Sequence, residues 1–247
     1  MTESPQSAPK ASGLQTVLNT IASPKEAFET LRVAPTWGWA AIISIVLVFV
    51  GGLLFAPASQ HATLGFAQHF VTTPMAANMS DAQKQKMVDD ALHPSTVKTM
   101  LGLVANSVII PFLACVLNAL FLLIGNAIGK GTSSFKNYFS SSMNVLVPTF
   151  GLAQLAAGLI GYFRGADSFN SYGDLFRVLP SLAWIVPGHG YAVGFFSAFS
   201  IFAIWGLYLN AMSLKVMGGV KPTVAWTVSI VILVLMAAAL GVPSMFA

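Results

Sequence analysis

Residues 37–56 read WGWAAIISIVLVFVGGLLFA, a run of twenty residues without one charged side chain. An α-helix rises about 1.5 Å per residue, so a run of this length covers the hydrocarbon core of a bilayer. Four further apolar runs follow at residues 101–128, 143–162, 193–212 and 223–242. Backbone amides surrounded by lipid must bond within their own segment, and each run is therefore expected to be helical. The sequence predicts an all-α integral membrane protein, with five transmembrane helices in a domain over residues 35–247.

The composition of the whole chain agrees with this prediction. Of 247 residues, 55% are hydrophobic and only 8% are charged, whereas a soluble domain carries about 25% charged residues. The net charge of +4 is too small and too dispersed for the basic face or stripe that binds nucleic acid. We therefore expect the lipid bilayer, and not nucleic acid, to contact most of the surface.

The loops between the predicted spans differ in charge. The short segments 129–142 and 213–222 contain basic residues and no acid, whereas basic and acidic residues cancel in the longer segments 57–100 and 163–192. The basic residues of the short segments are Lys130, Lys136, Lys215 and Lys221. Because short basic loops remain in the cytoplasm, the N-terminus is predicted to be cytoplasmic and the C-terminus extracytoplasmic. Opposite sides require an odd number of spans, and five is odd.

The region before the first span divides into two parts. Residues 1–13, rich in Ser, Pro and Ala, are predicted to be a disordered tail. Residues 14–34 form a cytoplasmic amphipathic segment, in which Ser23-Pro24-Lys25-Glu26 is typical of a helix start. The helix that follows presents Phe28 and Leu31 on one side. This segment either lies in the membrane interface or packs beneath the bundle, and both placements remain open.

None of the five predicted spans contains Asp, Glu, Lys, Arg or His. Intramembrane ionisable groups usually mark proton or ion paths, so their absence from these runs argues against a proton-coupled pump and against acid–base catalysis. The sequence therefore predicts no enzyme, no catalytic residue, no cofactor and no metal. A candidate polar intramembrane cluster consists of Asn118, Gln154 and Asn210. Such amides either join helices by hydrogen bonds or line a route for a polar solute or lipid headgroup.

Small residues recur at four-residue intervals in two of the spans. They are Ala153, Ala157 and Gly161 in the third span, and Gly125 and Gly129 at the end of the second. Small side chains at this spacing let two helices approach closely, either inside one bundle or between two copies of the chain.

A shorter apolar run covers residues 178–186. It is too short to cross a bilayer as a helix, and the Pro-Gly-His-Gly that follows at residues 187–190 is typical of a turn. The run is either re-entrant or interfacial.

Several short motifs stand in a fixed order along the chain. They are IASPKEAFE at residues 21–29, Pro35 and Trp37 before the first span, GKGTSSFK at residues 129–136, Pro148 in the third span, FAIW at residues 202–205, and Lys221 before the fifth span. In order and spacing they resemble the Yip1 family of small five-span membrane proteins. The resemblance covers nearly the whole chain apart from the two long outer loops. It implies a cytoplasmic N-terminal region and brings no catalytic residues.

The resemblance is to the bacterial branch of that family. Eukaryotic relatives, which are linked to Rab GTPases and vesicle traffic, carry Asp-Leu-Tyr-Gly-Pro before the first span, whereas residues 31–35 here read LRVAP. The resemblance therefore implies a multi-pass protein of the bacterial cytoplasmic (inner) membrane. Some bacterial members are thought to assist ABC-type export complexes, which implies a role as a transport accessory.

These observations lead to one expected function and one alternative. We expect a non-catalytic multi-pass membrane protein that is a partner or organiser of a membrane assembly, an export complex being one candidate. The predicted cytoplasmic contact face for the membrane-protein partner consists of Phe28, Lys130, Lys136, Lys215 and Lys221. The alternative is a small passive transporter or lipid-handling protein, in which the buried amides line the route.

Overall fold

The structure is a computed structural model that describes residues 12–188 and 190–245. These residues are almost entirely helical, and the one β-bridge among them joins Ser181 to Ser200. Most of the tail predicted over residues 1–13 lies outside the described residues. Its last residue does not belong to a tail, because Gly13 begins the first helix and the hydroxyl of Ser12 accepts a hydrogen bond from the Gln15 amide.

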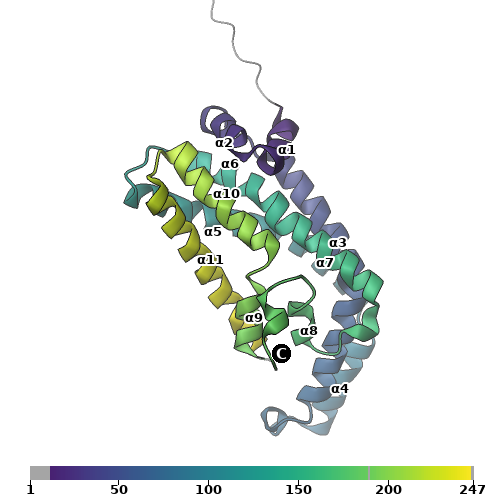
Figure 1. Ribbon diagram of the computed structural model, residues 1–247. Helices are drawn as coiled ribbons and strands as arrows, with labels where there is room; N and C mark the ends of the chain where they lie inside the picture. Colours follow the sequence, from purple (N-terminus) through teal and green to yellow (C-terminus); the bar gives the residue numbers. More distant parts are fainter. Residues whose placement is uncertain (1–11, 189, 246–247) are drawn as a thin grey trace, which may run out of the picture.

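The order of the elements can be followed in Figure 1. The α-helices are α1 (Gly13–Ala22), α2 (Pro24–Val33), α3 (Gly38–Phe70), α4 (Asp81–Leu92), α5 (Thr96–Ile128), α6 (Phe135–Leu146), α7 (Leu152–Arg164), α8 (Tyr172–Phe176), α9 (Tyr191–Ser197), α10 (Ile201–Gly218) and α11 (Pro222–Ser244). Short 3-10 helices are η1 (Pro74–Ala76), η3 (Ala166–Ser168) and η4 (Leu182–Ile185), and η2 (Val147–Gly151) is a π-helical turn between α6 and α7.

Five helices in the described ranges are long and apolar enough to cross a membrane. They are Gly38–Phe70, Thr96–Ile128, Phe135–Arg164, Ile201–Gly218 and Pro222–Ser244. The prediction of an all-α membrane protein with five crossing helices is therefore confirmed. Three of these helices are much longer than the apolar runs that predicted them: α3 continues through Pro57 to Phe70, α5 begins at Thr96, and the third begins at Phe135.

The predicted start of the fourth span is wrong. A single helix over residues 193–212 was expected, but α9 ends at Ser197 and α10 begins at Ile201. The side chain of Ser200 accepts a hydrogen bond from the Ala203 amide, which caps the new helix. An apolar run shows neither this cap nor the break before it, because Ala198 and Phe199 are as hydrophobic as a span requires.

The third crossing helix contains the π turn η2, which includes Pro148. Proline has no amide hydrogen, so Pro148 cannot donate to the carbonyl one turn earlier, and its ring crowds that carbonyl. A wider turn with one additional residue accommodates the ring without ending the helix.

The crossing helices connect two ends of the bundle (Figure 1). The helices α1 and α2 lie at one end, together with the α5–α6 and α10–α11 loops. The opposite end carries α4, α8, α9 and the last turns of α11. The segment before the first crossing helix and the end of the last one therefore lie at opposite ends.

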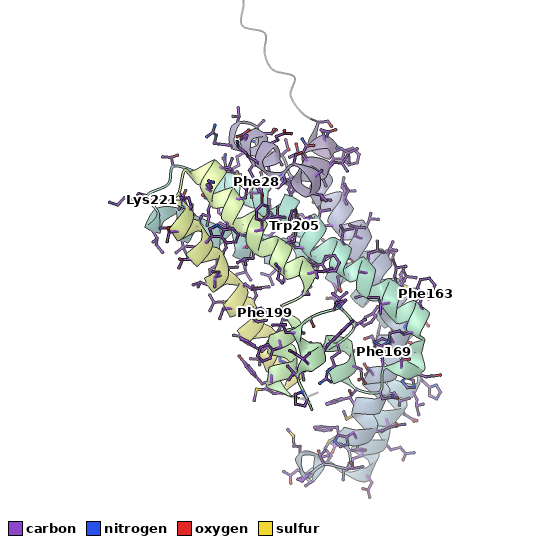
Figure 2. All side chains as sticks on the ribbon, in the orientation of Figure 1. Phe28, Phe163, Phe169, Phe199, Trp205 and Lys221 are labelled. Atoms are coloured by element: carbon purple, nitrogen blue, oxygen red, sulfur yellow. The ribbon has the colours of Figure 1, made fainter. Side chains whose placement is uncertain are left out.

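The two N-terminal helices contact the bundle in different ways. Phe28 and Leu31 of α2 are fully buried against Val145, Leu209 and Met217, and Figure 2 shows Phe28 at this contact. Of the two placements left open by the sequence, α2 thus packs beneath the bundle. The helix α1 buries Val17 but leaves a second apolar face at the surface. That face consists of Leu14, Leu18 and Ile21, whose 39–52% exposure suits contact with lipid.

Small residues bring α3 and α7 into backbone contact. A Cβ atom on Gly51 would overlap the carbonyl of Gln154, and one on Gly158 would overlap the carbonyl of Gly51. One turn further along α7, Gly161 lies against Phe55. The sequence left open whether small residues serve packing inside one bundle or contact between two copies of the chain. The contacts of Gly51, Gly158 and Gly161 are packing inside one bundle.

The short apolar run at residues 178–186 forms part of a cap on the opposite end of the bundle. Val178 is buried with Ala58 and Ala62 of α3. The guanidinium of Arg177 donates to the carbonyls of Ala183 (3.3 Å) and Val186 (2.9 Å), so it folds the following residues back on α8.

The contact between α3 and α7 can be tested by adding one methyl group. We expect Gly158→Ala to destabilise the protein by about 1–3 kcal/mol, because the methyl group must push two backbones apart. Gly102→Ala in α5 is the matched control: nothing lies within 4 Å of its new Cβ, and alanine favours a helix by up to about 1 kcal/mol over glycine. Thermal unfolding of the purified variants in one detergent measures both effects. Equal melting temperatures for Gly158→Ala and the wild type would contradict the packing described.

Candidate functional site: a polar seam and a basic end

Charge is distributed unevenly between the two ends of the bundle. Among the described residues, the end that carries α1 and α2 has six basic and two acidic side chains: Lys25, Arg32, Lys130, Lys136, Lys215 and Lys221, with Glu26 and Glu29. The opposite end has five of each sign: Lys84, Lys86, Lys98, Arg164 and Arg177, with Asp81, Asp89, Asp90, Asp167 and Asp174. We call the first of these the basic end. Its summed field attracts anionic groups.

Four of the five residues of the predicted contact face are available for contact. Lys130, Lys136, Lys215 and Lys221 are all exposed at the basic end, and Figure 2 shows Lys221 projecting outward from the α10–α11 loop. The inclusion of Phe28 is wrong, because its side chain is 0% exposed. A helical pattern places Phe28 on an apolar face but does not say that another helix covers it.

Two residues of the predicted polar cluster bond directly to each other. The amide nitrogen of Asn118 donates to Asn210 Oδ1 (3.1 Å) and to Ser142 Oγ (2.9 Å). The amide nitrogen of Asn210 donates in return to Asn118 Oδ1 (3.2 Å). Since these residues belong to α5, α6 and α10, the amide pair joins three of the crossing helices at one point.

Gln154 is not part of this cluster. It lies on α7, where its backbone carbonyl contacts Gly51 of α3, away from the contact of α5 with α10. Sequence position indicates how deep a residue sits in a span, but it does not show which neighbouring helix the residue meets.

Further polar contacts continue on α6 and were not predicted. The hydroxyls of Ser141 and Ser213 lie 2.7 Å apart and are fully buried. We call Asn118, Ser141, Ser142, Asn210 and Ser213 the polar seam. The sequence signal for Ser141 and Ser142 is the run Ser-Ser-Ser at residues 140–142, directly before the predicted third span.

The loop that bears Lys130 is held by a buried side chain. The amide nitrogen of Asn126 donates to the carbonyls of Gly131 (3.1 Å) and Ser133 (3.3 Å). Its oxygen accepts from the hydroxyl of Tyr138 (2.9 Å), which is also buried. All these contacts lie within one α5–α6 hairpin, so the conformation of the loop is fixed before any partner binds.

The α5–α6 loop is also joined to the loop that bears Lys221. The Thr132 amide donates to the carbonyl of Gly218 (3.0 Å), and a Cβ on Gly129 would overlap Val220. The two loops therefore form one surface. In this surface Lys130 adopts a left-handed conformation with φ +55°, which favours glycine and which no other non-glycine residue among those described adopts.

The polar seam and the basic end differ in the groups that they offer. The seam supplies neutral amides and hydroxyls that are bonded to one another, and the basic end supplies ammonium groups in water or at the headgroup level. Within residues 12–188 and 190–245, no three His, Cys, Asp or Glu side chains lie close enough together to hold a metal ion.

Comparison with known proteins gives one match. The family model described as the Yip1 domain matches residues 18–242, a range that includes α2, the polar seam, both lysine-bearing loops and nearly all of the five crossing helices. No curated protein matches the chain, and no solved structure matches it. Because the match covers residues 18–242 of the 247, this protein belongs to the Yip1 domain family.

Proposed function

We propose that this Yip1-family chain is a non-catalytic membrane protein that binds another membrane protein through its basic end and so organises a membrane assembly. An export complex is the leading candidate for that assembly. The four exposed lysines supply the contact: Lys136 and Lys215 stand on α6 and α10, and the buried Asn126 holds the loop of Lys130 in one conformation. A surface that is ordered in advance loses less conformational entropy on binding.

The observation that carries this proposal is the reciprocal amide pair. Asn118 and Asn210 use both oxygens and both nitrogens on each other and on Ser142. Amides that line a route must instead be free to bond a passing solute. The intramembrane polar groups of this bundle thus support helix association, which leaves the exposed ends for contacts with a partner. The passive transporter, our alternative, would need Asn118 and Asn210 to separate.

The proposal includes a location and an orientation. Short loops with an excess of lysine remain in the cytoplasm, and the basic end carries two such loops. We infer that the basic end faces the cytoplasm of a bacterial cell and that α4, α8 and α9 face the outer side of the inner membrane.

The amide pair distinguishes the two functions. We expect Asn118→Leu and Asn210→Leu each to lower stability, because each removes the hydrogen bonds between the two amides. The double variant should be more stable than the sum of the single losses predicts, with a coupling of about 0.6–1.7 kcal/mol. Thermal unfolding of the four proteins in one detergent gives this cycle, and Asn106→Leu, at an exposed position on the same helix, serves as control. Unchanged stability together with altered solute flux in liposomes would favour a transport route.

The orientation can be tested with single cysteines. Cys115 is the only cysteine in the chain and is buried, so Cys115→Ala gives a background without an accessible thiol. In spheroplasts we expect a membrane-impermeant maleimide to label Asp90→Cys at once and Lys136→Cys only after permeabilisation. The reverse order would place the basic end outside the cell.

The partner interaction needs a test that separates the basic end from the rest of the protein. We expect a partner to co-purify in a fixed ratio when the tagged chain is extracted at its native level in a mild detergent. The double variant Lys136→Glu/Lys215→Glu should lose that partner, because both positions lie beside α2 at the basic end. Lys84→Glu/Lys86→Glu at the opposite end is the matched control and should retain it. A chain that purifies alone and moves solute in liposomes would refute the proposal.

A further inference from the structure

A groove with a volume of about 330 Å³ runs between α5 and α11. The residues that line it are Phe121, Ile124, Gly125, Ile128, Thr223, Val224, Thr227, Val228, Val231 and Ile232. Apart from two threonines these side chains are apolar, and they belong to the halves of α5 and α11 nearest the basic end. The groove plays no part in the polar seam, since Asn118 bonds to α6 and α10.

The floor and the walls of the groove differ in their exposure. At the floor, Gly125 comes so close to Val228 that an added Cβ would lie 2.6 Å from its side chain. The walls remain open at the side of the bundle, where Ile124, Ile128 and Val231 are 50–67% exposed. In a membrane this opening faces acyl chains, so the groove is accessible from the lipid.

A positively charged pair stands at one end of the groove. Lys130 follows the wall residue Ile128 by two positions, and Lys221 precedes the lining residue Thr223 by two positions. Because Gly129 packs against Val220, the two loops meet at this end and bring both lysines to it. Both are exposed, and each lies two residues beyond the apolar lining, at the end of the groove.

The backbone at Lys130 gives a second, independent observation. Its φ of +55° costs a non-glycine residue of order 1 kcal/mol, and glycine occupies both neighbouring positions, Gly129 and Gly131. The loop therefore places a lysine where a third glycine would fit without strain. Such outliers persist only where the surrounding structure holds them, and they cluster at functional sites.

The lining and the charge of the groove favour a lipid chain over a partner helix. The groove is lined almost wholly by apolar side chains and lies next to two loops with exposed lysines, which match the apolar tail and the anionic headgroup of one phospholipid. A single acyl chain is narrower and flexible, and basic pockets between membrane helices are typical sites for anionic headgroups.

We propose that the groove between α5 and α11 binds one acyl chain of an anionic phospholipid, whose phosphate is held by Lys130 and Lys221. Two features identify this occupant: the groove is apolar and open to lipid, and the loops at one of its ends carry two exposed lysines. This site does not depend on the partner protein proposed above, because it requires only the purified chain and a bilayer.

The site can be tested by native mass spectrometry of the protein released from nanodiscs that contain equal amounts of phosphatidylglycerol and phosphatidylcholine. We expect the wild type to retain phosphatidylglycerol in preference. Lys130→Gly and Lys221→Gln should each lower this preference about fivefold, and the double variant should abolish it. Lys130→Gly also relieves the backbone strain, so its loss of lipid cannot come from misfolding.

Two matched controls separate the groove from general charge attraction. Lys136→Gln/Lys215→Gln removes equal charge at the basic end without touching the groove and should retain the preference. Thr227→Trp fills the groove and should release both lipids, whereas Ile230→Trp, exposed on the same helix outside the groove, should retain them. The proposal is overturned if Lys136→Gln/Lys215→Gln lowers the preference as much as Lys130→Gly/Lys221→Gln does. It is also overturned if Thr227→Trp retains lipid, or if inorganic phosphate alone displaces the lipid. Because Lys130 and Lys221 also belong to the proposed contact face, the partner interaction is judged separately, from Lys136→Glu/Lys215→Glu, so failure of the lipid site and failure of the proposed function give different results.

Discussion

In hydrocarbon a backbone or side-chain polar group has no water to bond, and this protein satisfies such groups in three ways. Its crossing segments are helices, whose amides bond within the segment. Two of its amide side chains, Asn118 and Asn210, bond each other across two helices. Where the chain must leave a helix near the opposite end of the bundle, the guanidinium of Arg177 bonds the carbonyls that are released. Each of the three reduces the number of arrangements open to the bundle, so the same constraint that requires helices also selects how they pack.

The features that follow from this constraint could be predicted from sequence, and those that depend on neighbours could not. Apolar length alone indicates five crossing helices. Span ends are less certain, because Ser200 ends the α9–α10 break by capping a helix inside an apolar run. Gln154 and Asn118 are equally deep in the sequence pattern, yet only Asn118 meets α10, since the faces of the helices decide which amides come together. Phe28 looks like a contact residue until α10 is seen to cover it.

The basic end combines order and charge. Asn126 fixes one lysine-bearing loop, and the contact of Gly129 with Val220 joins it to the other. The lysines therefore do not act as independent flexible charges. The first turn of α6 adjoins the end of α2, since Asn137 donates to the carbonyl of Arg32, and α2 covers α10 with Phe28 and Leu31. A molecule that contacts this end therefore meets a surface built from both the N-terminal helices and the membrane domain.

The π turn at Pro148 has a consequence for how one crossing helix serves two groups of neighbours. An α-helix turns about 100° per residue, so the additional residue in η2 rotates every side chain after it relative to those before it. Before the turn, α6 directs Ser141 and Ser142 toward α5 and α10. After the turn, α7 directs Gly158 and Gly161 toward α3. The turn therefore sets a fixed rotation between the two halves of the helix. Deletion of a single residue within it would keep the helix continuous but would rotate one half out of register with its neighbours.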